Sequence, residues 1–227
     1  NDTKSYGGIV GKGSGGGEVN YSFLLWFPET SWGVESVSQK VFFSLNGVSG
    51  GSIDSRHIFD NAYEMPVNEW HYISVTVNND SKYAKLYING VLFSERNFTG
   101  QNISTNDNPL QLGTYNSGAY TLNGKISSLA FWNQELSSEQ IQDNMNSLIT
   151  GSEQGIIGYW DFTEGQGNTL SDISGNGNDG ILYGPSWDDD VPLIQSNSEY
   201  AVGSVGPAGG FVIYDKGSVT DGWRYIE

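Results

Sequence analysis

Residues 171–180, SDISGNGNDG, carry oxygen-bearing side chains at alternating positions, with glycines between them. A calcium loop takes hard oxygen ligands from alternate residues and has a glycine where the chain turns sharply. Asp172, Ser174 and Asn176 stand at positions 1, 3 and 5 of such a loop. Asn178 could offer a carbonyl oxygen at position 7. The spacing therefore predicts a structural Ca²⁺ site in which Asp172 is the principal ligand.

The same residues fit a second structure, in which no ion is bound. Tyr183 stands at position 12, where a calcium loop of this type carries a bidentate Glu, so the ion would need another carboxylate from across the fold. Without an ion, Asp172 would cap a glycine-rich turn through backbone hydrogen bonds. A phosphate cradle is excluded, because it needs backbone N–H groups at a helix start and a strand-like segment follows here. The calcium site and the plain turn both stay open.

Aromatic side chains in turn-like segments are a second candidate site, because exposed rings stack on sugar rings while Asn and Asp side chains bind hydroxyl groups. The candidates for ligand binding are Trp32, Tyr63, Tyr115 and Tyr120. Each could instead anchor its own loop. A variant with all four changed to Ala should still fold if they are binding residues.

Residues for catalysis are sparse. Retaining glycosidases need two carboxyl groups about 5 Å apart, and no E-x-D-x-E triplet is present. Asp161 and Glu164 are three positions apart and would point to opposite faces of an extended strand. His57 and His71 lie in strand-like runs without a motif-placed serine, and the glycine-rich segment 11–18 lacks the Lys-Ser/Thr end of a phosphate-binding loop. The sequence therefore predicts no enzyme.

Composition narrows the class further. The 227 residues include 31 Gly and 30 aromatic residues (13 Tyr, 10 Phe, 7 Trp), a mix typical of an all-β protein rich in turns. The net charge of −16 disfavours nucleic acid as a partner, because the phosphate backbone would be repelled. The absence of cysteine excludes disulfides and thiolate metal sites. No apolar run approaches the length of a membrane helix, so membrane insertion is not expected.

Short strands with one helix among them are the elements that would position these residues. HYISVTV (71–77) alternates, with Ile73, Val75 and Val77 on one face, and Asn89-Gly90 joins two apolar runs as a hairpin turn. Further strands are predicted at 22–27, 40–45, 110–113, 125–133, 155–162 and 180–187. A helix is predicted over about 136–149, with Ser137 and Gln140 as a capping box and Gly151 at its end.

Several of these segments occur in an order that resembles a known family. NEWHYISVTV, KLYINGVLF, PLQLG and LNGKISSLAFWNQELSSEQI are similar to the laminin-G-like and pentraxin-like domains of the concanavalin A-like superfamily. The similarity runs from about residue 9 to residue 187. It implies an all-β jelly-roll sandwich of two antiparallel sheets with one short helix, in a secreted, modular and non-catalytic protein. Related sandwiches commonly hold a structural calcium ion, so the resemblance favours calcium in the 171–180 loop.

One departure from the family concerns the domain boundaries. In most bacterial members a segment like YWDFTEGQGNT…DISGNGNDG opens the domain, whereas here it follows the helix. Either a second domain begins there and is cut short, or strands 155–162 and 180–187 close a single sandwich over residues 1–187. We expect closure, because the acidic stretch 188–198 that follows reads as a linker. Residues 199–227 form a short β segment that is docked on the sandwich or starts a following module.

The function predicted from sequence is that of a non-catalytic module of an exported, modular surface protein, serving adhesion or carbohydrate binding. The tail resembles a stretch of large bacterial surface proteins, which supports an extracellular or cell-surface location beside other modules of one large polypeptide. A glycan or a cell-surface protein is the expected partner. The alternatives are a structural spacer or protein–protein interaction repeat and, less favoured by the residues, a glycoside-active enzyme.

Overall fold

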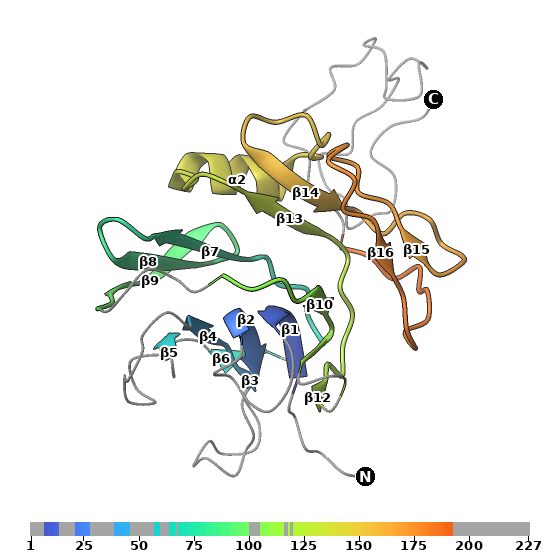
Figure 1. Cartoon of the computed structure of the whole chain (residues 1–227), viewed down its shortest axis with the longest axis horizontal. Coiled ribbons are helices and arrows are strands. Elements are labelled where there is room, and N and C mark those ends of the chain that lie inside the picture. The colour runs from blue at the N-terminus through green and yellow to red at the C-terminus, as the bar shows by residue number, and fades with distance from the viewer. Residues whose placement is uncertain are drawn as a thin grey trace, which may run out of the picture.

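The structure of the chain is a computed structural model that describes residues 7–13, 21–27, 39–45, 57–59, 64–66, 68–99, 105–115, 118 and 120–192. Trp32, Tyr63, the end of the predicted linker and the segment 199–227 lie outside the described residues. The described part is built of antiparallel strands with one helix, α2, among its elements (Figure 1). This confirms the predicted all-β class.

The first layer is a five-stranded antiparallel sheet in the order β10-β1-β2-β4-β5. Its strands are β1 (Gly7–Gly13), β2 (Tyr21–Phe27), β4 (Phe42–Leu45), β5 (His57–Phe59) and β10 (Leu110–Leu112). A short ladder of β3 (Gln39–Lys40) and β6 (Glu64–Met65) accompanies it. All four residues of β4 and most of β2 are buried, because apolar side chains occupy both faces of these strands.

The second layer is the antiparallel sheet of β7 (Ile73–Asn78), β8 (Tyr83–Ile88) and β9 (Val91–Asn97). The predicted Asn89-Gly90 hairpin turn is confirmed, and both residues have positive φ angles, +49° and +75°. That pair of angles matches a type I′ turn, whose twist suits the flanking strands. The alternation predicted for β7 is also confirmed, because Ile73, Val75 and Val77 all pack against the main core.

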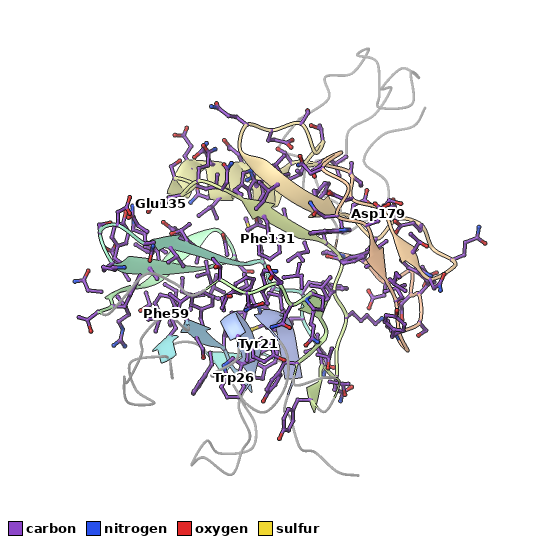
Figure 2. All side chains as sticks on the ribbon, in the orientation of Figure 1. Tyr21, Trp26, Phe59, Phe131, Glu135 and Asp179 are labelled. Atoms are coloured by element: carbon purple, nitrogen blue, oxygen red, sulfur yellow. The ribbon has the colours of Figure 1, made fainter. Side chains whose placement is uncertain are left out.

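The main hydrophobic core lies between these two layers. Leu25, Phe43 and Phe59 from the five-stranded sheet meet Leu86 and Ile88 from β8 in one buried cluster. Figure 2 shows the labelled Phe59 and Phe131 on the two sides of this interior. The region between the sheets is therefore filled by side chains from strands far apart in the sequence.

The opposite face of the five-stranded sheet carries a second, aromatic cluster. It contains Tyr21, Leu24, Trp26, Phe42 and Tyr115, with Tyr120 packed against it. Trp26 is 2% exposed, and its indole N–H donates to the Ser44 hydroxyl over 3.1 Å. Tyr115 and Tyr120 belong to the short strands β11 (Thr114–Tyr115) and β12 (Tyr120–Thr121), which pair with each other.

The helix α2 (Ser138–Asn146) covers the outer face of β7 and β8 (Figure 1). The predicted capping box is confirmed, with Ser137 and Gln140 exchanging side-chain-to-backbone hydrogen bonds. Ile141 is buried against Tyr87 and Leu136. The predicted range 136–149 was too long, because Ser147 turns to an extended conformation and ends the helix at Asn146.

This early end of α2 corrects two details of the helix prediction. Leu148, which falls within the predicted helix range, lies beyond the helix and is 74% exposed. Gly151 does not end the helix. It has a φ of +84°, and a Cβ placed on it would lie 2.5 Å from the Ile173 carbonyl oxygen, so its missing side chain permits close packing against the 171–180 loop.

Two further ladders follow along the chain. β13 (Leu129–Trp132) pairs with β14 (Ile156–Trp160), and β15 (Thr169–Leu170) pairs with β16 (Gly180–Ile181). The predicted strand 155–162 is thus present in shortened form as β14. The predicted strand 180–187 is not: only its first two residues are a strand, and the chain turns at Gly184, whose φ is +95°.

The pairing of β14 with β13 predicts that a fragment ending at Thr150 will not fold cooperatively. Removing β14 leaves β13 without its ladder and removes Trp160, whose ring lies edge-on to Phe131 at 6.5 Å. We expect fragment 1–150 to be insoluble or molten, with a broad urea transition beside the sharp one of the full chain. A soluble fragment with a cooperative transition would show that the sandwich is complete without β14.

Candidate functional site

The Asp172 carboxylate lies at the centre of the 171–180 loop and is only 8% exposed. Its Oδ1 accepts hydrogen bonds from the backbone N–H of Tyr159 at 3.1 Å and from both the N–H and the hydroxyl of Ser174 at 3.0 and 2.6 Å. Its Oδ2 accepts one from the Asn178 N–H at 2.9 Å. The loop is closed by the Asp172 N–H, which donates to Asp179 Oδ1 at 2.9 Å.

These donors determine the acidity of Asp172. Burial by itself works to raise the pKa of a carboxyl group. The hydrogen bonds from Ser174, Asn178 and Tyr159 outweigh it, because they stabilise the ionised form, and they lower the pKa of Asp172 to about 2. Asp172 is therefore a carboxylate at every pH at which the protein would normally be studied.

The loop covers the edge of β14 that β13 leaves open. The Asn178 side-chain amide donates to the Ile157 carbonyl at 2.8 Å, and that of Asn176 reaches the Ile156 carbonyl at 3.4 Å. The Ile173 N–H donates to the Tyr159 carbonyl at 2.8 Å. Because an unpaired strand edge exposes backbone donors and acceptors, these bonds complete β14 much as another strand would.

The four residues predicted to bind calcium are thus brought together, but as hydrogen-bonding partners of one another and of β14. A carboxylate has about four lone-pair directions, and Asp172 receives four hydrogen bonds. Three of these donors share Oδ1 and one reaches Oδ2, so the turn is held by hydrogen bonds without requiring an ion, while Oδ2 keeps room for a further partner. The described residues also hold no group of three or more His, Asp or Glu side chains that could hold a metal.

Calcium binding by the loop stays a prediction, and the melting temperature tests it. A ligand bound only by the folded state raises that temperature. If the hydrogen-bonded turn is complete in itself, saturating Ca²⁺ and a chelator should give the same melting temperature. A rise with Ca²⁺ that disappears in Asp172→Ala would establish the metal site.

The Asp172 carboxylate should contribute measurably to stability, with a defined dependence on pH. Asp172→Ala leaves several buried N–H groups without acceptors, which should lower the free energy of unfolding by about 1–3 kcal/mol or more. The folded-state pKa lies below the ordinary value of 3.8, so this contribution is present above about pH 4 and is lost as the pH falls towards 2. Urea unfolding of wild type and variant should converge over this interval.

The matched control for that experiment is Asp189→Ala, which removes an exposed carboxylate of the same type. This variant should unfold like the wild type at neutral pH. Equal stability of Asp172→Ala and wild type at pH 7 would contradict the anchoring role of Asp172.

Two of the four aromatic residues predicted to bind a ligand, Tyr115 and Tyr120, are described by the structure, and they lie next to each other. Their rings stack with centroids 4.7 Å apart and planes inclined by 23°. Tyr115 was expected in an exposed turn, but it lies in β11, is 4% exposed and touches Tyr21 and Trp26 edge-on. It is buried because β11 folds over the aromatic face of the five-stranded sheet, and only the half-buried Tyr120 reaches the surface.

The candidate catalytic groups are held in local hydrogen bonds. Asp161 Oδ1 accepts from the N–H and hydroxyl of Thr163, and Glu164 Oε1 accepts from the Ser171 N–H at 2.7 Å. The His71 Nε2 is 3.0 Å from the Pro66 carbonyl oxygen. The expectation that Asp161 and Glu164 lie on one extended strand was wrong, since β14 ends at Trp160 and Phe162 has a φ of +54°.

A polar cluster around Glu135 joins the second layer to the start of α2. Glu135 accepts hydrogen bonds from the Tyr83 hydroxyl, the Asn78 amide and the Lys85 ammonium group. Burial works to raise the pKa of Glu135, but these bonds outweigh it and lower the pKa. The cluster is an anchor between elements, and its two β8 members, Tyr83 and Lys85, lie on the face of that strand opposite the core.

The sequence prediction missed two aromatic residues as site candidates, one exposed and one half-buried. Tyr183, assigned to a strand, is 85% exposed. The half-buried Trp187 donates its indole N–H to the Gly167 carbonyl at 2.8 Å. The turn sequence Gly184-Pro185 disfavours a strand that continues past Tyr183. It was the sequence signal that could have predicted Tyr183 at the surface.

No helix among the described residues is long and apolar enough to cross a membrane.

With the fold and these sites described, the family can be stated. Residues 1–142 match the profile of the concanavalin A-like lectin/glucanases superfamily. This match covers more than half of the 227 residues. The chain belongs to this superfamily, and the predicted concanavalin A-like β-sandwich is confirmed.

Two solved structures are similar to the chain. One is a "putative carbohydrate binding protein" from Bacteroides ovatus, with 17% sequence identity and a TM-score of 0.55 over 78% of this chain. The chain spans about half of that protein, 52% of its length. The other is an S-layer domain-containing protein from Clostridium thermocellum, with 18% identity, coverage of 63% of this chain and 64% of that one, and a TM-score of 0.26. No curated protein matches the chain.

Proposed function

We propose that the chain is a non-catalytic carbohydrate-binding module of an exported protein. The observation that carries this proposal is the aromatic stack at the surface of the five-stranded sheet. Tyr120 lies half-buried on Tyr115, which in turn is buried on Tyr21 and Trp26. An aromatic ring held rigidly from beneath can bind the apolar face of a sugar with little loss of conformational entropy.

Family membership supports the same function, since the superfamily is that of lectins and glucanases. The Bacteroides ovatus protein supports the fold on which such a site would be built. Between binding and hydrolysis, the local bonding of the carboxylates favours binding. Asp161 and Glu164 stabilise turns after β14, and Asp172 holds the 171–180 loop.

Export and attachment to other modules are part of the proposal, because polysaccharides that a binding module would reach lie largely outside cells. The first residues of the predicted linker are bound to the module, which favours a junction of defined geometry with the next module. The Lys125 ammonium group lies 2.9 Å from a carboxylate oxygen of both Asp188 and Asp190. These ion pairs hold the start of the linker against the module, at the point where the chain would continue to a neighbouring module. The same arrangement would suit the alternative function of a structural spacer.

Glycan binding should depend on the ring of Tyr120. In affinity electrophoresis through gels containing plant, fungal or bacterial polysaccharides, wild type should be retarded by at least one of them. Tyr120→Ala should reduce the retardation without lowering the unfolding midpoint by more than a surface change does, since Tyr115 stays in place. Leu148→Ala, which removes another exposed apolar side chain, is the control. Retardation by none of the polysaccharides would leave the spacer function as the better account.

A further inference from the structure

The chain just beyond β16 carries two aromatic residues, Tyr183 and Trp187, near the start of β15. Thr169 pairs with Ile181, and the Leu182 N–H donates to the Asn168 carbonyl at 2.8 Å. Tyr183 is the next residue along the chain, so its backbone lies near residues 167–168. The Trp187 indole donates to the carbonyl of Gly167.

Gly167 keeps the space beside these rings open. It has a φ of +79°, and a Cβ built on it would have no heavy atom within 4 Å. The hydrogen bond of Trp187 uses its only polar group, so the indole is held in one orientation. Tyr183 is the most exposed of the large hydrophobic residues in the described segments, at 85%. The hairpin end thus combines a fixed ring, an exposed ring and an open space.

We propose that Tyr183 and Trp187 form a binding surface for an uncharged sugar of a polysaccharide. The proposal rests on the proposed carbohydrate-binding function and assigns it a site outside the segment that matches the family profile. Tyr183 supplies an exposed ring and a hydroxyl group, an amphipathic combination that suits the apolar and polar sides of a pyranose. Asp188 and Asp189, next in the chain, offer carboxylate oxygens that accept hydrogen bonds from sugar hydroxyls.

The charges of the described residues around this surface disfavour an acidic sugar. Three consecutive aspartates, 188–190, follow Trp187, and the chain carries a net charge of −16. Lys125 is paired with two of them, since both Asp188 and Asp190 lie 2.9 Å from its ammonium group. Among the described residues here, a uronate or sulfate group would therefore meet mainly like charge, which disfavours binding.

Three other lysines make hydrogen bonds to residues outside this hairpin. Lys12 donates to the Asn108 carbonyl, Lys82 to the Asn79 side chain and Lys85 to Glu135. Figure 1 shows β9, which carries Arg96, on the opposite side of the molecule from β15 and β16. Uncharged hydroxyl groups, which carboxylates bind well, are therefore the chemistry that this hairpin recognises.

The test uses affinity electrophoresis of the full chain at low salt, with neutral polysaccharides (xyloglucan, galactomannan, a mixed-linkage β-glucan) and acidic ones (polygalacturonate, heparin). Wild type should be retarded by a neutral polysaccharide and by neither acidic one. Tyr183→Ala should weaken that binding about tenfold or more, a loss of about 1.4 kcal/mol. Tyr183→Phe should retain most of it, because the ring is kept. Leu148→Ala, at a distant exposed position, should bind like the wild type.

Each of the other possible results would contradict a particular part of the proposals. Neutral binding that survives Tyr183→Ala and is lost in Tyr120→Ala overturns the hairpin site and leaves the proposed function standing. Binding to an acidic polysaccharide that requires neither ring overturns the charge argument. Absence of binding to every polysaccharide overturns both proposals. Unfolding midpoints show whether each variant is intact, and since Tyr183 is 85% exposed its replacement should leave the midpoint unchanged.

Discussion

The buried carboxylate of Asp172 is the interaction on which the second half of the structure depends. It gathers N–H groups from Tyr159, Ser174 and Asn178, and so ties a ten-residue polar loop to the edge of β14. The only large apolar side chain in this glycine-rich loop is that of Ile173, so the position of the loop depends mainly on directed hydrogen bonds. With that edge covered, β14 pairs with β13 on its other side and Trp160 reaches the core ring of Phe131.

The same anchor positions the hairpin that carries the proposed sugar surface. Leu170 in β15 and Asp172 are two residues apart, and β16 begins directly after Asp179, which accepts the Asp172 N–H. The start and end of the loop are therefore joined at the base of the hairpin. Tyr183 and Trp187 follow β16 along the chain, and the Trp187 indole is bonded to the Gly167 carbonyl just before β15.

In the first half of the chain the structure depends on β8, a strand that packs against other elements on both of its faces. β8 sends Ala84, Leu86 and Ile88 into the core between the sheets, while Tyr83, Lys85 and Tyr87 face the start of α2. One hairpin thus joins three layers. Its polar face is bound by Glu135 and its apolar face by the five-stranded sheet, so a slip of one residue in register would disrupt both contacts at once.

The sequence by itself determined the features that depend on local chemistry. Alternation in β7, the Asn89-Gly90 turn and the Ser137–Gln140 capping box were all predictable, because each depends on residues within a few positions of one another. The resemblance of ordered motifs predicted the all-β sandwich. The proximity of Asp172, Ser174, Asn176 and Asn178 was predictable for the same reason of short spacing.

Tertiary structure decided what those residues contact. One of the backbone N–H groups that donate to the Asp172 carboxylate belongs to Tyr159, which lies in β14 and is brought to the loop by the tertiary fold. The burial of Tyr115 and Tyr183 was also not predictable from the sequence. Tyr115 was expected at the surface and is buried, whereas Tyr183 was expected in a strand and is exposed. Burial is a property of the neighbours that long-range pairing brings, and neither β11 folding over an aromatic sheet face nor the strand ending after Ile181 is encoded in the aromatic residue itself.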